Sequence, residues 1–526
     1  MDAEVRRRIA AWLRAPATEP LFSRAVGRRA LAPSLGLVGF LVGALLWWLV
    51  FATSERFLAH EGLGDDGVAY GAWVVGWKWD IPAMGLSPYN AQRLFAAGFV
   101  RWLLEVQRLP ITTANIVHTF AMIDFFAVLV AWLAWVRACR ALPLTRAGWL
   151  VGALVAFGSF GVLKWIPFDP VLTDALGLAA GGLALWFWLE DRVALLWATG
   201  LVGAFAWPSF GLQACVLLAL PRPRAKVGCA LPDGRGARLL ADALAALFAA
   251  MWCVLAWPFR EWTPGSGVIY ASRSVFILAE VIVTLVLFFG LRAMAYPAVL
   301  VWHARTERVR AAIGLASAAA LWLCTRAILA WASAHPTTEL SQVPEVKMSN
   351  FLDMSLFLSV QRPAAFLVAH LVFLGPWVAF AIARWPSVCR AAARVGPGLL
   401  AALGAAFLTA TNSESRRLFA VALPVAFAVV PGLDFGWTPR RLGAFALFTL
   451  LGSRVWATAV QLPVADLEPI AACEGPWMPI GHYQLGLLLL SVGALWAVGV
   501  ARATAPEGEA VTLLVPERLD TSGQDA

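Results

Sequence analysis

Charged side chains are scarce in this sequence: Asp, Glu, Lys and Arg make up 14% of its 526 residues, whereas 60% of the residues are hydrophobic. A chain of this length would need many more polar side chains to coat several water-soluble domains. Apolar runs of roughly 20 residues, long enough to cross a hydrocarbon core of about 30 Å, recur about a dozen times. Because lipid offers the backbone no hydrogen-bond partners, each such run is expected to form a helix.

Cysteine and histidine are also scarce, with seven and six residues. The cysteines occur singly and only Cys473 is expected in an external loop, which excludes an external disulfide framework within one chain. The sequence contains no Cys-x-x-Cys pair. Four isolated histidines lack the spacing of metal ligands and are expected to have structural roles: His118, His303, His370 and His482.

Basic residues outnumber acidic ones, and the net charge is +9. They lie mostly in short segments between apolar runs, which favours a membrane topology over nucleic-acid binding. Residues 1–32 form a basic leader before the first run, which places the N-terminus on the cytoplasmic side. Its apolar residues recur at helical spacing opposite the arginines, so we expect a helix on the inner membrane surface. The leader is long for a cleavable signal peptide, and we expect it to be retained.

The predicted fold class is all-α, a polytopic transmembrane helical bundle of about twelve crossings in one domain, 33–502. Residues 503–526, rich in Glu, Asp, Gly, Ser and Pro, are expected to form a cytoplasmic tail with little order. The expected spans are 33–53, 115–137, 147–164, 171–190, 239–259, 274–297, 311–334, 363–383, 396–411, 418–434, 442–461 and 482–502.

The apolar segment 193–220 is too long for one straight span, and Trp207-Pro208-Ser209 interrupts it near its middle. Arg192 precedes it and five basic residues follow it, so both ends are expected in the cytoplasm. The segment therefore predicts a re-entrant helical hairpin that turns near Pro208. The five residues that follow are Arg222, Arg224, Lys226, Arg235 and Arg238.

The first external loop, 54–114, is much longer than a connection between two helices needs to be. It contains HEGLGDDGVAYGAW, a tryptophan-rich stretch, PYNAQRLF and an amphipathic run that predicts juxtamembrane helices. Asp65-Asp66-Gly67 is typical of a turn that caps a helix in the headgroup region. Capping and catalysis are compatible, so both interpretations of this motif stay open.

Two further external sites carry charge. In KWIPFDPVLTDALG, Asp169 before Pro170 predicts a helix N-cap, whereas Asp174 lies about one turn deeper, where a carboxylate needs a partner or a wet cavity. Lys164 is close enough in sequence to be that partner. In TNSESRRLF, two adjacent arginines on the external side suit phosphate oxygens, or alternatively a salt bridge or a lipid headgroup. The residues of this site are Glu414, Arg416 and Arg417.

The layout resembles the GT-C superfamily of integral-membrane glycosyltransferases, which use sugars linked to polyprenyl phosphate. Such enzymes carry an acidic motif in a long external first loop, and an acid at the outer start of the fourth helix matches Asp174. Bacterial relatives often have a Tyr-x-x-x-Arg-like segment, matched by Tyr89 and Arg93. A re-entrant segment and charged external corners such as SESRR also recur in them. The acidic motif here is EGLGDDGVAY, with Glu61, Asp65, Asp66 and Tyr70.

This resemblance implies single displacement at the anomeric carbon of the donor sugar, on the external face of a bacterial inner membrane. A carboxylate would deprotonate the acceptor hydroxyl, and cations would stabilise the departing phosphate. The resemblance assigns Asp66 as the general base, with Asp65 as the alternative. Asp174 would orient the acceptor or bind a divalent ion. In many relatives the re-entrant segment carries an Arg-Glu pair, where this chain has Ala206-Trp207-Pro208-Ser209.

The resemblance also implies the ligands. Arg93, Arg416 and Arg417 would bind the phosphate of a polyprenyl-phosphate sugar donor. No cofactor is required by the sequence, and a divalent cation, Mg²⁺ or Mn²⁺, held by Asp66 and Asp174 stays open. The other partners are membrane lipids and an acceptor whose identity stays open; nucleic acid is not expected. The supporting residues are Glu61, Tyr70, Tyr89, Lys164, Asp169 and Glu414.

Three alternatives share part of this layout. A transporter or flippase is also a large bundle, but it typically has repeated halves with broken helices at corresponding positions, and only 193–220 is visibly broken here. A polymerase or ligase of surface polysaccharide usually has its long external loop late in the chain. An inactive member of the superfamily would only bind lipid or assemble with partners, and the departure at WPSF is compatible with that.

Overall fold

The structure is a computed structural model of the chain. It describes residues 3–16, 35–54, 59–142, 144–222, 235–256, 273–303, 308–335, 362–411, 414–433, 437–458, 478 and 480–504. Residues 17–32 of the predicted leader, residues 505–526 of the predicted tail and Cys473 lie outside the described residues.

The first half of the chain forms a leader helix, a first span, a loop with several short helices, and a series of packed helices. Their bounds are α1 (Ala3–Arg14), α2 (Leu35–Thr53), η1 (Ala59–Gly62), α3 (Asp65–Val75), η2 (Ile81–Met84), α4 (Pro88–Ala91), α5 (Leu94–Val106), α6 (Thr113–Ala138), η3 (Cys139–Ala141), α7 (Arg146–Phe157), η4 (Gly161–Trp165), α8 (Ile166–Phe168), α9 (Asp174–Leu189), α10 (Val193–Ala204) and α11 (Phe210–Ala219).

The second half continues with longer helices, between which lies a group of shorter ones from α17 to η7. Their bounds are α12 (Arg235–Ala256), α13 (Arg273–His303), α14 (Arg308–Ala332), α17 (Ala365–Leu374), α18 (Trp377–Ala383), α19 (Trp385–Val395), α20 (Pro397–Thr409), η7 (Ser415–Leu418), α21 (Phe419–Leu433), α22 (Pro439–Thr458) and α23 (Ile480–Thr504).

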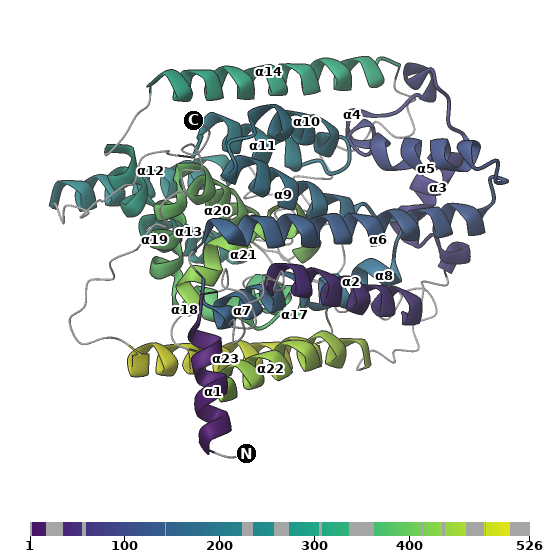
Figure 1. The fold of residues 1–526 in the computed structure, drawn as a ribbon. Coiled ribbons are helices and arrows are strands. Elements are labelled where there is room, and N and C mark those ends of the chain that lie inside the picture. Colours follow the sequence, from purple (N-terminus) through teal and green to yellow (C-terminus); the bar gives the residue numbers. More distant parts are fainter. Residues whose placement is uncertain are drawn as a thin grey trace, which may run out of the picture.

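The helices form a bundle with two distinct ends. In Figure 1, α2, α6, α14, α22 and α23 run in roughly one direction, whereas the leader helix α1 lies across it. The short helices α3 and α5 cover the end on the right, here named the loop end, and α12 and α19 lie at the opposite end. Helix α1 docks beside the start of α7, where Arg146 N donates to Ala15 O at 2.9 Å.

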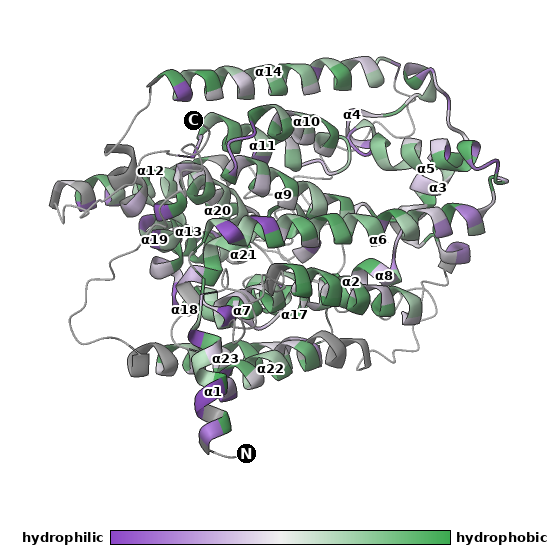
Figure 2. Cartoon of the chain, viewed as in Figure 1, coloured by the Kyte–Doolittle hydropathy of each residue, from purple (hydrophilic) through white to green (hydrophobic). Residues whose placement is uncertain are grey.

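Large apolar side chains are exposed along the outer helices. Leu45 of α2, Leu323 of α14 and Leu495 of α23 are all more than half exposed, and Figure 2 shows these helices as mostly hydrophobic. Contiguous apolar surface of this extent marks contact with lipid or another apolar partner. By length and composition, four helices of the described part can cross a membrane: Thr113–Ala141, Ile277–Ala295, Val309–Ala332 and Ile480–Gly499.

A fifth crossing is possible if the bent pair Arg146–Phe157 and Gly161–Phe168, which meet at 52°, forms one broken span. The prediction of about twelve complete crossings is therefore wrong for the described helices. Several predicted spans are helices of 10 to 16 residues, among them α9, α17 and α20. At about 1.5 Å per residue, 16 residues cover about 24 Å, less than a hydrocarbon core of about 30 Å.

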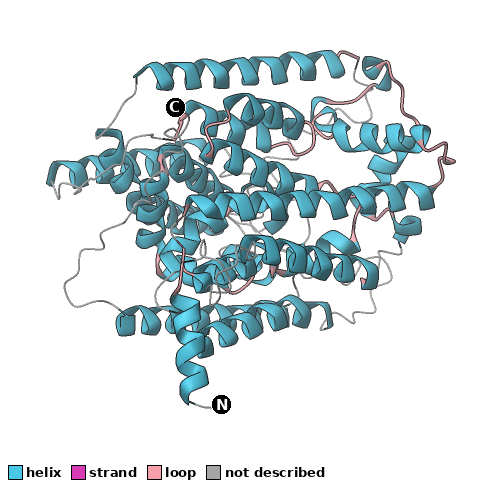
Figure 3. Cartoon of the chain, viewed as in Figure 1, coloured by secondary structure: helices cyan, strands magenta, loops and turns pink. Residues whose placement is uncertain are grey.

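The predicted all-α class is confirmed for the described ranges, which contain helices and loops but no strand (Figure 3). An isolated backbone bridge joins Pro16 and Thr145. Within these ranges, most backbone hydrogen-bonding groups are therefore satisfied inside single helices, as a lipid environment requires.

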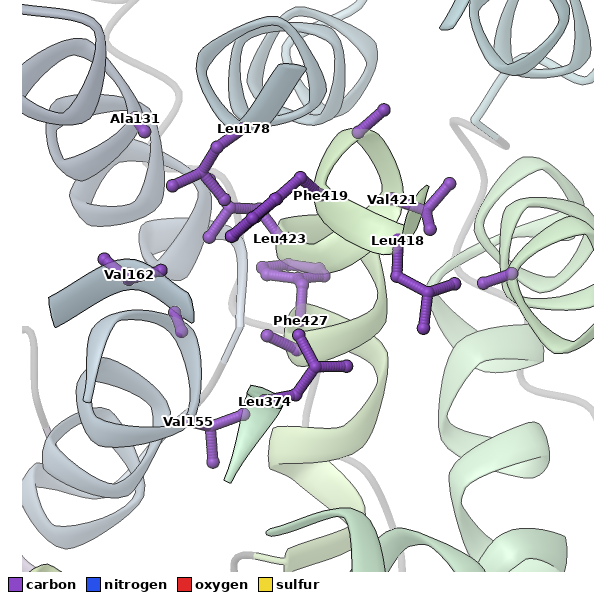
Figure 4. Close-up of a cluster of buried hydrophobic side chains, with 14 of the residues drawn as sticks. Ala131, Val155, Val162, Leu178, Leu374, Leu418, Phe419, Val421, Leu423 and Phe427 are labelled. Carbon is purple, nitrogen blue, oxygen red and sulfur yellow. The ribbon is translucent and has the colours of Figure 1, made fainter. Parts of the chain in front are cut away.

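Helix α21 lies at the centre of the bundle. Its side chains Phe419, Leu423 and Phe427 meet residues from α6, α7, η4, α9 and α17 (Figure 4). A Cβ atom added at Gly181 of α9 would lie 2.1 Å from the carbonyl oxygen of Ala420. Helices α9 and α21 therefore touch through their backbones, a close approach that small residues permit.

Helices α10 and α11 pack against each other as an antiparallel hairpin. A Cβ atom at Gly200 would contact Ala214, and one at Gly203 would contact Phe210. The chain reverses between Ala204 and Phe210, so the break lies around Pro208, where the proline interrupts the helix. Whether this hairpin enters and leaves the membrane on one side stays a prediction.

Candidate functional site

Asp174 is the centre of the candidate site. It is the first residue of α9 and is 2% exposed. The indole Nε1 of Trp165 donates to its Oδ2 at 2.9 Å, whereas its Oδ1 is buried and has no hydrogen-bond partner among the described residues. The charges of Arg416, Arg93 and Glu414 act on this carboxyl group. A buried carboxylate with one unpaired oxygen is costly unless a ligand or a cation completes it.

The arrangement before α9 differs from the prediction in two respects. Asp169 is not the N-cap of a helix, because it ends α8 and the next helix begins only at Asp174, after Thr173. Val171 is fully buried and packs against α3 instead of extending α9. Asp174 therefore lies in the first turn of α9 and not one turn deeper.

Lys164 is buried in the π-helical turn η4, and its Nζ lies 5.5 Å from the centre of the Phe168 ring. The hydrogen-bond donor that the structure gives to Asp174 is Trp165, the residue after Lys164. Sequence reasoning missed Trp165. A usable signal was present, because a buried indole N–H usually has a hydrogen-bond partner and Asp174 is close in sequence.

Arg93 comes from the first loop and points its guanidinium at Tyr89. The Arg93 Cζ lies 4.4 Å from the centre of the Tyr89 ring, a cation–π contact, and the Arg93 Nε is buried without a hydrogen-bond partner among the described residues. Ser87 Oγ accepts from Asn90 N at 3.3 Å and so caps the short helix α4 that carries Tyr89. The predicted Tyr-x-x-x-Arg segment thus forms one compact unit.

Glu414 holds the two arginines of the SESRR corner. It accepts hydrogen bonds from Arg416 Nε at 2.8 Å and from Arg417 Nε at 2.5 Å. Burial raises the pKa of Glu414, but the charges of Arg416 and Arg417 outweigh this effect and hold the pKa below its ordinary value of 4.5. The side chain of Arg416 is 23% exposed and that of Arg417 is 40% exposed, so both reach the surface of the protein.

His370 of α17 fixes the same corner from inside. Its Nε2 lies 2.8 Å from Ala410 O and its Nδ1 lies 2.8 Å from Ser415 Oγ. A carbonyl oxygen only accepts, so Nε2 carries the proton, and in the neutral ring Nδ1 accepts from the Ser415 hydroxyl. The structure thus gives His370 two hydrogen-bond partners and a positioning role for the turn that carries Glu414.

The acidic motif of the first loop begins α3. The helix begins at Asp65, and its N-cap residue is Gly64, which has a φ of 70°. The interpretation of Asp65-Asp66-Gly67 as the capping turn is therefore wrong by one residue, because the left-handed backbone there favours glycine. The side chains of Asp65 and Asp66 lie outside the described part of the structure. Glu61 is exposed in η1 with φ of 58°.

Tyr70 is a core residue of this loop. It is 2% exposed, and its ring lies 5.0 Å from that of Trp73 and 6.4 Å from that of Phe120, measured between centres. The edge-to-face contact with Phe120 attaches α3 to α6. Tyr70 therefore positions α3 through packing.

Three separate contacts bring the predicted motifs together around Asp174. Gly67, directly after Asp66, approaches Val171 so closely that an added Cβ would lie 2.9 Å from Val171 Cγ1. Phe95 N, two residues after Arg93, donates to Phe205 O at 3.0 Å. A Cβ atom added at Gly177, one turn after Asp174, would lie 3.2 Å from the Trp207 ring. The acidic motif, the arginine segment and the hairpin turn thus surround the start of α9.

The site is chemically a buried acid close to several guanidinium groups. Within the described ranges, no group of three or more His, Cys, Asp or Glu side chains is arranged to hold a metal ion. Arginines near a carboxylate suit a ligand that carries both hydroxyl groups and a phosphate.

Comparison with protein-family models, curated proteins and solved structures finds no match to this chain. The function is therefore inferred from the residues and their geometry. Fold alone would not decide it, because one fold hosts many activities.

Proposed function

We propose that this chain is a membrane glycosyltransferase of the GT-C type. It would transfer a sugar from a polyprenyl-phosphate donor to an acceptor on the loop-end face, the external face of a bacterial inner membrane. The single observation that carries the proposal is the convergence of buried Asp174 with the charges of Arg93 and Arg416. These residues come from three distant parts of the chain.

The proposed reaction is a single displacement. The acceptor oxygen bonds to the anomeric carbon of the sugar while the bond from that carbon to the phosphate oxygen breaks. The acceptor proton passes to Asp66, the proposed general base, with Asp65 as the alternative. The leaving phosphate keeps the electron pair of the broken bond. Asp174 orients the acceptor hydroxyl through its unpaired Oδ1.

The departing polyprenyl phosphate gains negative charge, which Arg93, Arg416 and Arg417 would stabilise. Glu414 binds both arginines of the corner through their Nε atoms. A guanidinium group has five N–H donors, so each arginine can bind a phosphate in addition to Glu414. Donors positioned before the reaction stabilise developing charge most effectively.

A divalent cation, Mg²⁺ or Mn²⁺, belongs to the proposal as an option. Asp66 and Asp174 would hold it, because α3 and the start of α9 lie in contact at Gly67 and Val171. Its chemistry would be neutralisation of the leaving phosphate. The three arginines supply the same kind of charge. Loss of activity with a chelator would therefore indicate a bound cation, and unchanged activity would indicate that the arginines neutralise the phosphate without one.

The finer architecture is also proposed: a GT-C-like bundle with both termini in the cytoplasm and a re-entrant hairpin at 193–220. Short helices such as α9, α10 and α11 support it, because discontinuous helices in membranes are tolerated where they line a cavity. The basic leader helix α1, which lies at the start of α7, supports a cytoplasmic N-terminus.

The test uses the full chain in lipid nanodiscs. Release of polyprenyl phosphate is measured from a panel of radiolabelled polyprenyl-phosphate sugars, with and without chelator. The Asp66→Asn and Asp174→Asn variants should each lose about 100-fold or more of the transfer rate. Glu105→Gln is the matched control, because Glu105 is an acid of the same loop that pairs with Arg101 at 2.6 Å, outside the site.

Each outcome decides a separate point. Full activity of Asp66→Asn would reject it as the general base, and full activity of Asp174→Asn would reject the site. No turnover across the panel with well-folded protein would reject the transferase. That result would favour a transporter or an inactive binding protein.

A further inference from the structure

The amphipathic helix α19 at the opposite end of the bundle carries two arginines on one face. Arg390 and Arg394 are one turn apart and exposed, while its other face is buried in the bundle through Val388, Cys389, Ala392 and Ala393. Arg390 Nη2 donates to Ser387 Oγ at 3.2 Å, and no acidic side chain of the described part pairs with either arginine. Like charges at this spacing repel each other, so a bound anion would be stabilising.

Arg394 is exposed, but the protein around it removes part of its surrounding water. Burial, together with the charge of Arg390, lowers the pKa of Arg394. An amphipathic helix with basic residues on its polar face typically lies in the headgroup region of a membrane, where anionic phosphates are available.

An apolar crevice of about 290 Å³ lies next to this helix, between α11, α12, α13 and α20. Phe248, Met294 and Leu400 are among its lining residues. Its volume is near the lower end of the about 300–1,000 Å³ typical of small-molecule sites. It lies away from Asp174, because Leu220 and Pro397, which also line it, belong to the end of α11 and the start of α20.

The arginines and the crevice are joined by short connections. Pro397 lines the crevice three residues after Arg394. Trp385 of α19 donates from Nε1 to Gly290 O at 3.1 Å, directly before Leu291, another lining residue. Figure 1 shows α19 close to α12 and α13 at the end away from α3 and α5. A charged head and an apolar pocket therefore lie side by side.

We propose that this place binds one anionic phospholipid. Its phosphate would lie on Arg390 and Arg394, and part of one acyl chain would enter the crevice. A free anion would gain nothing from an apolar crevice, and an uncharged lipid would gain nothing from two arginines. The combination selects a ligand with both parts. This site is independent of the proposed transferase activity, because it shares no residue with the Asp174 site.

The experiment uses the full chain, delipidated in detergent and titrated with phosphatidylglycerol or with phosphatidylcholine of the same chains. Bound lipid is counted by native mass spectrometry. Phosphatidylglycerol should bind about 30-fold more tightly, which corresponds to about 2 kcal/mol for two arginines. The double substitution Arg390→Gln and Arg394→Gln should remove that preference.

Two further variants separate charge from shape. Arg440→Gln with Arg441→Gln removes the same charge at the start of α22, and the preference should stay unchanged. Ala401→Phe fills the crevice and should weaken both lipids without changing charge. Equal binding of the two lipids, a preference that survives the double substitution in α19, or equal competition by chain-free glycerol phosphate would each overturn the proposal.

Discussion

Trp165 and Asp174, nine residues apart, are joined by a 2.9 Å hydrogen bond from the indole Nε1 to the carboxylate Oδ2. The same indole ring lies 5.9 Å from that of Phe373, measured between centres. Trp165 therefore links the buried acid to the aromatic core around α17 and α21. It is the one hydrogen-bond donor that the described residues supply to the Asp174 side chain.

Trp165→Phe should destabilise the protein, because it keeps a ring against Phe373 but removes the donor. A hydrogen bond to a charged group contributes about 1.5–3 kcal/mol. The measurement is thermal unfolding in detergent. Trp102→Phe is the control, since Trp102 is 45% exposed on α5. Equal unfolding temperatures for the two variants would show that the hydrogen bond contributes no stability.

Glu414→Gln should lose stability that depends on pH. Because the folded pKa of Glu414 lies below its ordinary value of 4.5, the contribution is fully present above that value. It is lost as pH falls through and below it, where the unfolded state binds a proton first. Unfolding temperatures of the wild type and the variant, measured from pH 7 downward, should therefore converge in acid. A constant difference would contradict the ion pairs.

Gly181→Ala should destabilise the bundle by about 1–3 kcal/mol or more, because the new methyl group would overlap the Ala420 carbonyl of α21. Gly443→Ala is the matched control. A Cβ there meets nothing within 4 Å, and the better helix propensity of alanine adds up to about 1 kcal/mol. Denaturant titration of both variants checks the expected opposite signs. A neutral Gly181→Ala would mean that α9 and α21 are farther apart.

His370→Phe should lower stability while nearly conserving the ring volume. It leaves the Ala410 carbonyl and the Ser415 hydroxyl without their partner, at about 1–3 kcal/mol for each buried group. It should also lower sugar transfer, since both arginines follow Ser415. His335→Phe is the control, because His335 is exposed. Wild-type stability of His370→Phe would reject the positioning role.

The helical class was predictable from composition because lipid permits few backbone structures, whereas the number of crossings was not. A hydropathy window counts apolar residues and does not detect where a helix stops. Segment 171–190 illustrates this: Val171 is drawn into packing against Gly67, and α9 starts only at Asp174. Where a helix begins thus depends on a contact between residues about a hundred positions apart.

The candidate site, too, was predictable only in part. The sequence indicated Asp174 and the SESRR corner through charges that are unusual near a membrane, and Arg93 through a resemblance to a Tyr-x-x-x-Arg segment; their proposed roles stay predictions. Trp165 and His370 were not assigned to the site, because a tryptophan or histidine in an apolar run is usually a core residue. Their hydrogen bonds depend on how η4, α17 and the corner pack together.

The hydrogen bond from Phe95 N to Phe205 O is made by main-chain atoms only. Its formation does not depend on which side chains occupy the hairpin turn, so the letters WPSF at 207–210 leave the attachment in place. Only a proline at position 95 would remove the donor. Because this hydrogen bond attaches the segment that carries Arg93 to the hairpin turn, we expect a ligand that shifts the turn to displace that segment as well.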